Sequence, residues 1–483
     1  MIRGAVLASV LGKLLVGLAA AMLPAFAVSL LSPGDDPAPI LQSLLITVAA
    51  GLALLLPARP GAFELSLREG LLLSLLAWVG ACLFGALPFY FSPYFPTFTD
   101  AVFESTSGFT TTGATVLTDV EVLPRSIQLW RCGTHWIGGM GILLLAIAVL
   151  PLIGAGGIHL YRAEFSGARS EKLKPRIAET ASSLWKIYLS LTLLEYLALR
   201  LAGMNGFESI CHTFSTLGTG GFSTRAASVG GFESPVIEYI IVVFMFLAGL
   251  NFTQQYRLYV ERQPGRFFSD PEVRAYALFV AVSTLLVWIS VVVQSGYGVS
   301  HGFRSALFVV TTTITTTGFV SDDYEKWAPA PQLLILALMV CGGCTGSTAG
   351  GLKVARIVTV ARALARELKK VVERRAVFSV RYGEQPLPEA AVQTALSTLC
   401  LAVFVHFGAS MVLTAAGLDV LSAISAVVAT MFNVGPGLGS VGPMDNYNHL
   451  SPLSKWTLSV CMLAGRLEFY TAFVVLTPAF WRK

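Results

Sequence analysis

Four short turns rich in threonine and glycine recur along the chain, and each follows a semi-apolar stretch too short to cross a membrane. They are residues 110–114, 215–219, 315–319 and 432–436. Their glycines, Gly113, Gly218, Gly318 and Gly435, lie 105, 100 and 117 residues apart. Each interval holds an apolar run, a loop, a second apolar run and a short helical stretch. A period of this kind indicates four copies of one structural unit.

The composition places these units in a membrane. Hydrophobic residues make up 54% of the 483 and charged residues only 13%, against about 25% charged in soluble domains. An apolar helix needs about 20 residues to cross a bilayer, and ten runs approach or exceed that length. They cover residues 14–31, 40–56, 67–91, 127–153, 184–201, 235–256, 273–293, 332–360, 392–416 and 453–481.

We therefore expect an all-α integral membrane protein with ten transmembrane helices. Four membrane-pore-membrane repeats surround a pseudo-fourfold pore, and two extra helices precede them. The expected divisions are 1–60 for the extra helices and 61–160, 161–265, 266–385 and 386–483 for the repeats. Ala25-Phe26-Ala27 resembles a signal-peptide cleavage site, but the run 14–31 that contains it is long enough to span and a second apolar run follows at 40–56, which favours two retained helices.

The charges indicate the orientation of these spans. Clusters of arginine and lysine occupy 162–176, 257–274 and 353–381, whereas the segments on the opposite side carry mainly aspartate and glutamate. Because inner loops are enriched in cations, both termini are expected in the cytoplasm of a multi-pass inner-membrane protein. The net charge of +5 thus reflects topology and not nucleic-acid binding. The seven cysteines have no regular spacing, which favours free thiols.

The four turns have the chemistry of a cation path. Irregular backbone survives at membrane depth only where it lines a cavity, and rings of carbonyls can replace the hydration shell of a cation. Glycine permits the backbone angles that turn a carbonyl to the axis, and the threonine hydroxyls add acceptors. The candidate cation-binding residues are Thr111, Thr112, Gly113, Thr216, Leu217, Gly218, Thr316, Thr317, Gly318, Asn433, Val434 and Gly435.

At these residues the chain resembles the Trk/Ktr/HKT superfamily of potassium uptake proteins, and its two leading helices resemble the TrkH branch. The resemblance implies K⁺ as the transported ion, a path on the pseudo-fourfold axis and a homodimer. Glycine at all four key positions fits the potassium-selecting pattern, although one glycine per turn predicts weaker discrimination than in true potassium channels. The fourth turn departs most from that pattern, with Asn433 and Pro436.

The stretch GGCTGSTAGG, residues 342–351, interrupts the helical run 332–360 with ten small residues. Each glycine costs a helix about 1 kcal/mol relative to alanine, which favours a broken, mobile segment. Close helix packing through its repeated GxxxG spacing is the alternative. The resemblance implies an intramembrane gate loop, residues 342–352. Its expected gate residues are Gly346, Ser347, Thr348, Ala349, Gly350 and the following Lys353.

Arg466 lies near the middle of the last apolar run. A central arginine costs about 2.5–3.5 kcal/mol even on insertion scales, so we expect its side chain to face a cavity. The resemblance implies that it projects into the pore below the turns and raises the barrier to cations. A structural salt bridge to another helix, involving Glu468 or Glu104, is the alternative.

The expected function is potassium uptake across the cytoplasmic membrane, channel-like and gated by the intramembrane loop. A sodium- or proton-coupled potassium symporter is the alternative. No nucleophile motif such as G-x-S-x-G indicates an enzyme, and no organic cofactor is expected on this chain. The longest inner segment, about 361–389, is too short for a nucleotide-binding domain. The resemblance therefore implies a separate TrkA-like cytosolic nucleotide-binding subunit, alongside membrane lipid as a further partner.

Overall fold

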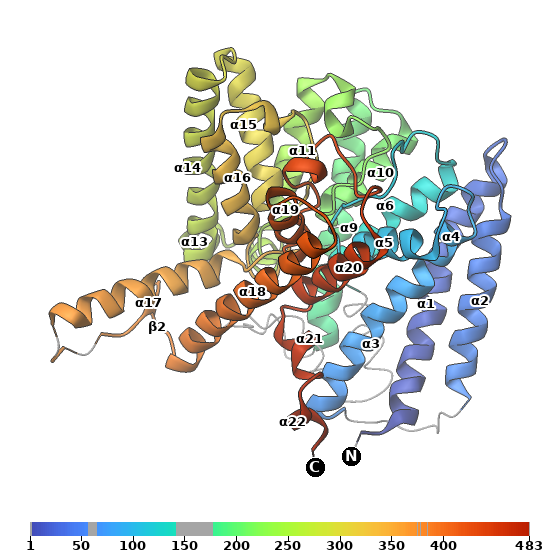
Figure 1. Cartoon of the computed structure of the whole chain (residues 1–483), viewed down its shortest axis with the longest axis horizontal. Coiled ribbons are helices and arrows are strands. Elements are labelled where there is room, and N and C mark those ends of the chain that lie inside the picture. The colour runs from blue at the N-terminus through green and yellow to red at the C-terminus, as the bar shows by residue number, and fades with distance from the viewer. Residues whose placement is uncertain are drawn as a thin grey trace.

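The computed structural model describes residues 2–56, 65–141 and 177–482, except 374, 377 and 384. Within these ranges the chain is almost entirely helical (Figure 1). Its strands form one short antiparallel pair, in which Arg381 faces Pro386 and Tyr382 faces Gln385; they are β1 (Arg381–Tyr382) and β2 (Gln385–Pro386). The expected all-α fold is confirmed.

Five of the described helical runs are long and apolar enough to cross a membrane. They are α1 (Gly4–Leu31), α2 (Ala38–Leu55), Arg68–Tyr90 in α3 (Leu67–Gly85) and α4 (Leu87–Tyr90), α14 (Pro271–Gln294) and α18 (Glu389–Ala415). A sixth would consist of α11 (Pro235–Ala248) and α12 (Phe252–Tyr259), which are bent by 103° at the break between them. These helices support an integral membrane protein, and the number ten stays a prediction.

One order of elements recurs four times: a long helix, a short helix that ends in an irregular loop, and a further helix. The long helices are α3, α9 (Ile177–Leu201), α14 and α18; the short helices are α5 (Phe98–Phe109), α10 (Gly206–Leu217), α15 (Val299–Ile314) and α19 (Val420–Met431); the third helices are α6 (Arg125–Met140), α11, α16 (Pro329–Cys341) and α20 (Pro452–Arg466). The exact repeat boundaries are not tested by this order.

In the second, third and fourth units the third helix breaks inside its apolar run, and a break was expected only at 332–360. The run 235–256 breaks between α11 and α12, and the run 453–481 breaks after Arg466, where Glu468 and Phe469 have φ of 55° and 60°. The break in 332–360 separates α16 from α17 (Val354–Val372). In the first unit, α6 ends at Met140, and the rest of 127–153 and the cations at 162–176 lie outside the described residues.

Smaller elements complete the chain. They are α13 (Pro264–Ser269), α21 (Tyr470–Val474), α22 (Pro478–Trp481) and the 3₁₀ turns Ser228–Phe232, Tyr324–Lys326 and Gly439–Val441. The labelled amino and carboxyl ends of the chain lie at the same end of the molecule (Figure 1).

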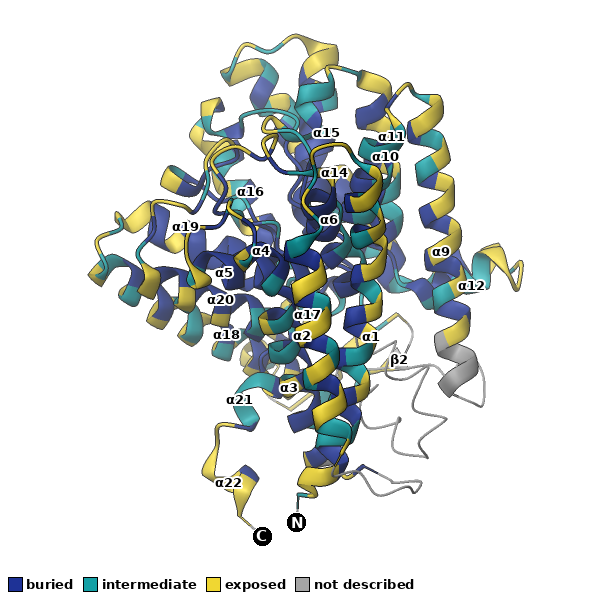
Figure 2. Cartoon of the chain, turned by 90° about the vertical axis from the view of Figure 1, so that its right-hand side faces the viewer, coloured by how far each residue is buried: buried dark blue, intermediate teal, exposed yellow. Residues whose placement is uncertain are grey.

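The burial pattern is that of a protein surrounded by lipid. Large apolar side chains are exposed on the outward faces of the long helices, including Leu193, Leu286 and Phe404, at 59%, 53% and 76% exposure. Figure 2 shows these exposed faces around a buried interior. Contiguous exposed apolar surface is costly in water but is satisfied by hydrocarbon. The two leading helices pack tightly at Gly12 and Gly51, where an added Cβ would lie 2.6 Å and 2.9 Å from the opposite backbone oxygen.

Three of the four short helices are anchored at their starts by a side-chain cap. Thr97, Asn205 and Asp419 each accept a hydrogen bond from a backbone N–H in the first turn of α5, α10 and α19. Hydrogen bonds from the Ser422 side chain and backbone hold the pKa of Asp419, which lies in the preceding loop, below its ordinary value. The carboxyl ends of these short helices lead directly into the four loops, so the partial negative charge of each helix end lies next to its loop.

Candidate ion path and gate loop

The four loops share one backbone conformation. In each, a residue with a left-handed φ of 54–58° is followed two positions later by a glycine with a φ of 78–98°. These pairs are Thr111 with Gly113, Thr219 with Gly221, Thr316 with Gly318, and Asn433 with Gly435. The residue between them donates its N–H to a carbonyl five residues earlier; the bonds are Thr112 to Ser107, Gly220 to Ser215, Thr317 to Thr312 and Val434 to Ala429, at 2.7–2.8 Å. We call residues 110–114, 218–222, 315–319 and 432–436 loops 1 to 4.

The expected alignment of the second turn is therefore wrong by three residues. Thr216 and Leu217 lie inside α10, and Gly218 is its C-cap with a φ of −66°. The glycine that matches Gly113 is Gly221, and the spacings become 108, 97 and 117 residues. The segment holds three glycines, at 218, 220 and 221. The alignment failed because it matched the first of them with Gly113. The Gly-Phe pair at 221–222, repeated at 318–319, was the signal that could have identified the correct position.

The four loops close into a ring. Each key glycine faces the backbone of the next loop so closely that an added Cβ would overlap a carbonyl oxygen. The distances from that Cβ are 2.1 Å for Gly113 to Gly220, 2.2 Å for Gly221 to Thr317, 1.9 Å for Gly318 to Val434 and 2.4 Å for Gly435 to Thr112. The order 1, 2, 3, 4 and back to 1 places the loops around one axis. Glycine is required both by its φ and by this contact.

The ring presents carbonyl oxygens without protein partners. The carbonyls of Thr112, Gly220, Thr317 and Val434 accept no hydrogen bond within the described residues, although all four residues are buried. Among the key glycines, Gly435 differs because its carbonyl accepts a 2.7 Å bond from the Tyr447 hydroxyl. Buried carbonyls in proteins are nearly always satisfied, so this ring of oxygens matches the requirement of a cation or of water.

A buried ion pair supports loops 1 and 2 from behind. Arg131 Nε lies 2.6 Å from Glu104 Oε1, and the two side chains are 2% and 0% exposed. Glu104 also accepts bonds from the Val116 N–H and the Thr115 hydroxyl, directly after loop 1. Arg131 donates to the Ser223 carbonyl at 3.1 Å, directly after loop 2. The sequence alone did not identify this pair.

The same arginine stacks on loop 2. Its guanidinium carbon lies 3.5 Å from the centre of the Phe222 ring, and the His135 ring covers that phenylalanine with a 4.0 Å centroid separation. The ion pair therefore fixes the outer ends of two neighbouring loops relative to each other, through one carboxylate and one guanidinium.

Residues 342–353 form a loop inside the molecule, between α16 and α17. Its first half is attached to the break between α11 and α12: the Cys344 N–H donates to Gly249 at 2.8 Å, and the Gly346 carbonyl accepts from the Phe252 N–H at 3.1 Å. The Thr345 N–H donates to the buried Glu272 carboxylate at 2.6 Å. Gly342, Gly346 and Gly351 have φ of 73–75°. This segment is irregular backbone and not the close-packed GxxxG helix of the alternative interpretation.

The second half of this loop touches loops 3 and 4. The Gly350 N–H donates to the Thr316 hydroxyl at 2.6 Å, and the Gly351 N–H donates to the Phe432 carbonyl at 3.1 Å. The loop thus connects the second unit with loops 3 and 4, directly beside the ring.

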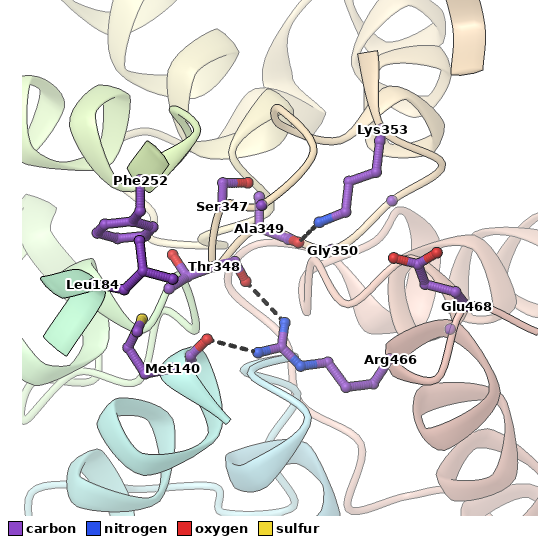
Figure 3. Close-up of a pocket in the computed structure, with 14 residues that line it drawn as sticks. Met140, Leu184, Phe252, Ser347, Thr348, Ala349, Gly350, Lys353, Arg466 and Glu468 are labelled. Carbon is purple, nitrogen blue, oxygen red and sulfur yellow. Dashed lines mark hydrogen bonds between the residues drawn. The ribbon is translucent and has the colours of Figure 1, made fainter. Parts of the chain in front are cut away.

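Arg466 reaches this loop from the opposite side (Figure 3). Its guanidinium donates to the Thr348 carbonyl at 2.8 Å and to the Gly138 and Gly139 carbonyls at 2.5 and 3.0 Å. Lys353 donates to the Ala349 carbonyl. Of the carboxylates considered as partners of Arg466, Glu104 is paired with Arg131, and Glu468 forms an ion pair with Arg356.

Between the loop and Arg466 lies a cavity of about 40 Å³, which is bordered by both cationic side chains, Lys353 and Arg466. A cavity of this size holds only a few water molecules. The expected gate residues Gly346, Ser347, Thr348, Ala349, Gly350 and Lys353 all line it, together with Arg466. The structure therefore brings the predicted gate residues together in one place.

The fold and this arrangement define an all-helical membrane protein with a ring of four re-entrant loops. The family model TrkH, described as a cation transport protein, matches residues 38–483. The chain belongs to the TrkH family, as the resemblance predicted, and it is a transporter and not an enzyme. It is 40% identical to the Trk system potassium uptake protein TrkH of Halomonas elongata over 98% of each chain. It is 42% identical to that of Escherichia coli K12 over 92% of each.

The fold is also that of a solved relative. The crystal structure of the potassium transporter TrkH from Vibrio parahaemolyticus matches with a TM-score of 0.91 and 37% identity, covering 100% of both chains.

Proposed function

We propose that this chain takes up K⁺ across the cytoplasmic membrane through the ring of loops 1 to 4. The observation that carries the proposal is the closed ring of buried carbonyls without protein partners, held by four glycines. Membership of a cation transport family and the similarity to potassium uptake proteins support the choice of ion. The proposed ion-binding residues are Thr111, Thr112, Gly113, Thr219, Gly220, Gly221, Thr316, Thr317, Gly318, Asn433, Val434 and Gly435.

Carbonyl rings suit a large, weakly hydrated cation because they replace its water ligands at modest field strength. Only one glycine of each loop has the left-handed conformation together with the overlap against its neighbour, and the Gly435 carbonyl is shared with Tyr447. Because the Gly435 carbonyl also accepts this hydrogen bond, the carbonyl ligands of the four loops are not equivalent in the proposed ring. We expect it to prefer K⁺ and Rb⁺ over Na⁺ while discriminating less strictly than a symmetric filter.

The loop at 342–353 is the proposed gate. It lies beside the ring, is held by hydrogen bonds to its neighbours and carries Lys353, while Arg466 faces it across the small cavity. A cation passing this point meets the positive side chains of Lys353 and Arg466 beside the carboxylate of Glu468, in a cavity that holds only a few water molecules. Conduction then requires that the loop move, and regulation would act on that movement.

The proposed orientation places both termini in the cytoplasm of the inner membrane. The proposed partners are a second copy of the chain, membrane lipid and a TrkA-like cytosolic subunit that binds nucleotide. The basic residues after the gate loop, including the exposed Arg362 and Lys369 on α17, provide surface for an anionic or regulatory partner.

Replacing Arg466 with alanine is expected to raise Rb⁺ flux about tenfold. A unit charge about 8 Å from a cation costs on the order of 2 kcal/mol at an effective dielectric constant near 20, and the loss of the Thr348 bond also loosens the gate loop. Tracer uptake into liposomes measures the change. Lys13→Ala, on the exposed face of α1, removes an equal charge away from the ring. Equal effects of the two substitutions would rule out a local barrier.

The experiment that tests the function is Rb⁺ tracer uptake into liposomes that contain the purified chain, competed by K⁺, Na⁺ and Li⁺. We expect competition by K⁺ and Rb⁺, weak competition by Na⁺, and a changed preference in Gly318→Ser. Uptake that occurs only with a sodium or proton gradient would favour the coupled symporter. Uptake competed equally by all three ions would contradict a selective ring.

A further inference from the structure

The four residues with left-handed φ at the inner end of the ring have the same backbone but different side-chain partners. The Thr219 hydroxyl donates to Gly218 at 2.6 Å, and the Asn433 amide donates to Thr112 and Met462 at 3.0 Å. Within the described residues, the Thr111 hydroxyl has no partner. Thr316 alone among the four bonds to the gate loop, by accepting the Gly350 N–H at 2.6 Å.

Next to that bond, Gly350 and Gly351 of the gate loop also lie close to loop 4. A Cβ added to Gly350 would lie 2.5 Å from the Phe432 carbonyl oxygen and 2.9 Å from the Asn433 Cβ. The next residue, Gly351, donates its N–H to the same Phe432 carbonyl at 3.1 Å. Two consecutive N–H groups of the gate loop are therefore satisfied by loops 3 and 4, in a region where all of these residues are buried except the half-buried Gly351.

We propose that Thr316 is a positioning residue that latches the gate loop to the ring in the closed state. This inference rests on the proposed function, since it assumes that residues 342–353 obstruct the path. When the loop moves away, the Gly350 N–H loses its acceptor, and an unsatisfied buried N–H is costly. The hydroxyl of Thr316 therefore stabilises the closed state specifically, because it bonds to the loop only while the loop lies against the ring.

The test is Thr316→Val, which keeps the backbone carbonyl that Thr316 contributes to the proposed path and the branched Cβ at the left-handed φ, but removes the hydroxyl that accepts the Gly350 N–H. We expect Rb⁺ flux in liposomes to rise about five- to tenfold, with the preference for Rb⁺ over Na⁺ retained. Thr316→Ser keeps the hydroxyl and should restore the low flux.

The matched control is Thr111→Val. It removes the hydroxyl at the equivalent position of loop 1, where no bond to the gate loop exists, and so measures what the loss of a ring hydroxyl does to ion passage by itself. Size-exclusion profiles of each purified variant establish that it is folded. If Thr316→Val raises flux no more than Thr111→Val does, the latch is wrong.

A third variant separates the latch from the gate itself. Deletion within Thr345–Ala349 should raise flux if the loop is a gate, and Thr316→Val should then add nothing further, because its partner is already displaced. A raised flux in the deletion, together with an unchanged flux in Thr316→Val, overturns the latch and leaves the gate. An unchanged flux in the folded deletion variant overturns the gate, and the latch with it.

Discussion

Replacing Gly221 with alanine is expected to reduce Rb⁺ flux by about a hundredfold. The added Cβ would lie 2.2 Å from the Thr317 carbonyl oxygen, and we place that carbonyl in the ion path. In addition, the φ of 79° at this position is strained for alanine. Strain and displacement together of about 3 kcal/mol correspond to that factor. Tracer uptake by liposomes with equal amounts of folded protein measures the effect.

The control for this substitution is Gly133→Ala. Gly133 lies in α6, the helix that follows loop 1, and a Cβ added there would have no atom within 4 Å. Alanine also has a higher helix propensity than glycine. Its flux should stay within about twofold of the parent. If Gly221→Ala conducts as well as Gly133→Ala, the second loop does not contribute to the path in the arrangement described above.

Local composition was enough to predict the features that depend on a few neighbouring residues. In three of the four predicted turns the expected glycine has a left-handed φ, and the predicted gate segment is irregular backbone, because a threonine run that ends in glycine, or five glycines among ten residues, constrains the backbone directly. The prediction of the second loop failed because its key glycine, Gly221, is distinguished by a contact with Thr317, almost a hundred residues away. The one sequence signal that marks Gly221 is the Gly-Phe pair that it shares with loop 3, and the prediction did not use it.

The break between α11 and α12 had a weak local signal in the sequence that was overlooked. Gly249 ends α11, and Asn251 caps α12 by accepting the Thr253 N–H at 2.7 Å. A glycine followed by a good N-cap residue marks a helix end and a new start, yet the apolar run continued through it and was interpreted as one span.

Long-range partners could not be predicted. The Tyr447 hydroxyl reaches the Gly435 carbonyl, while its N–H reaches the Thr115 carbonyl at 2.8 Å. It therefore joins the end of loop 4 to the end of loop 1. A tyrosine in a polar outer segment has many possible roles, and only the closed ring of loops brings it between these two backbones.

The buried pair Glu104 and Arg131 carries the second large effect. Glu104→Ala is expected to lower the free energy of unfolding by about 3–5 kcal/mol, because it leaves the Arg131 charge buried without its carboxylate. It also removes the acceptor of the Val116 N–H. Thermal unfolding of the purified protein in detergent, followed by size-exclusion profiles, measures the loss. The exposed pair Lys370 and Glu367 provides the control, since Lys370→Ala should cost about 1 kcal/mol or less.

A double substitution separates charge burial from the positioning of the loops. Changing both partners to apolar residues, Glu104→Leu with Arg131→Met, removes the uncompensated charge and should recover much of the stability. The bonds from Glu104 to Thr115 and Val116 and from Arg131 to Ser223 remain absent. Loops 1 and 2 then lose their common anchor, and we expect the preference for Rb⁺ over Na⁺ to fall severalfold in a protein that still folds. Full selectivity in the stable double variant would mean that the pair maintains the fold without shaping the ring.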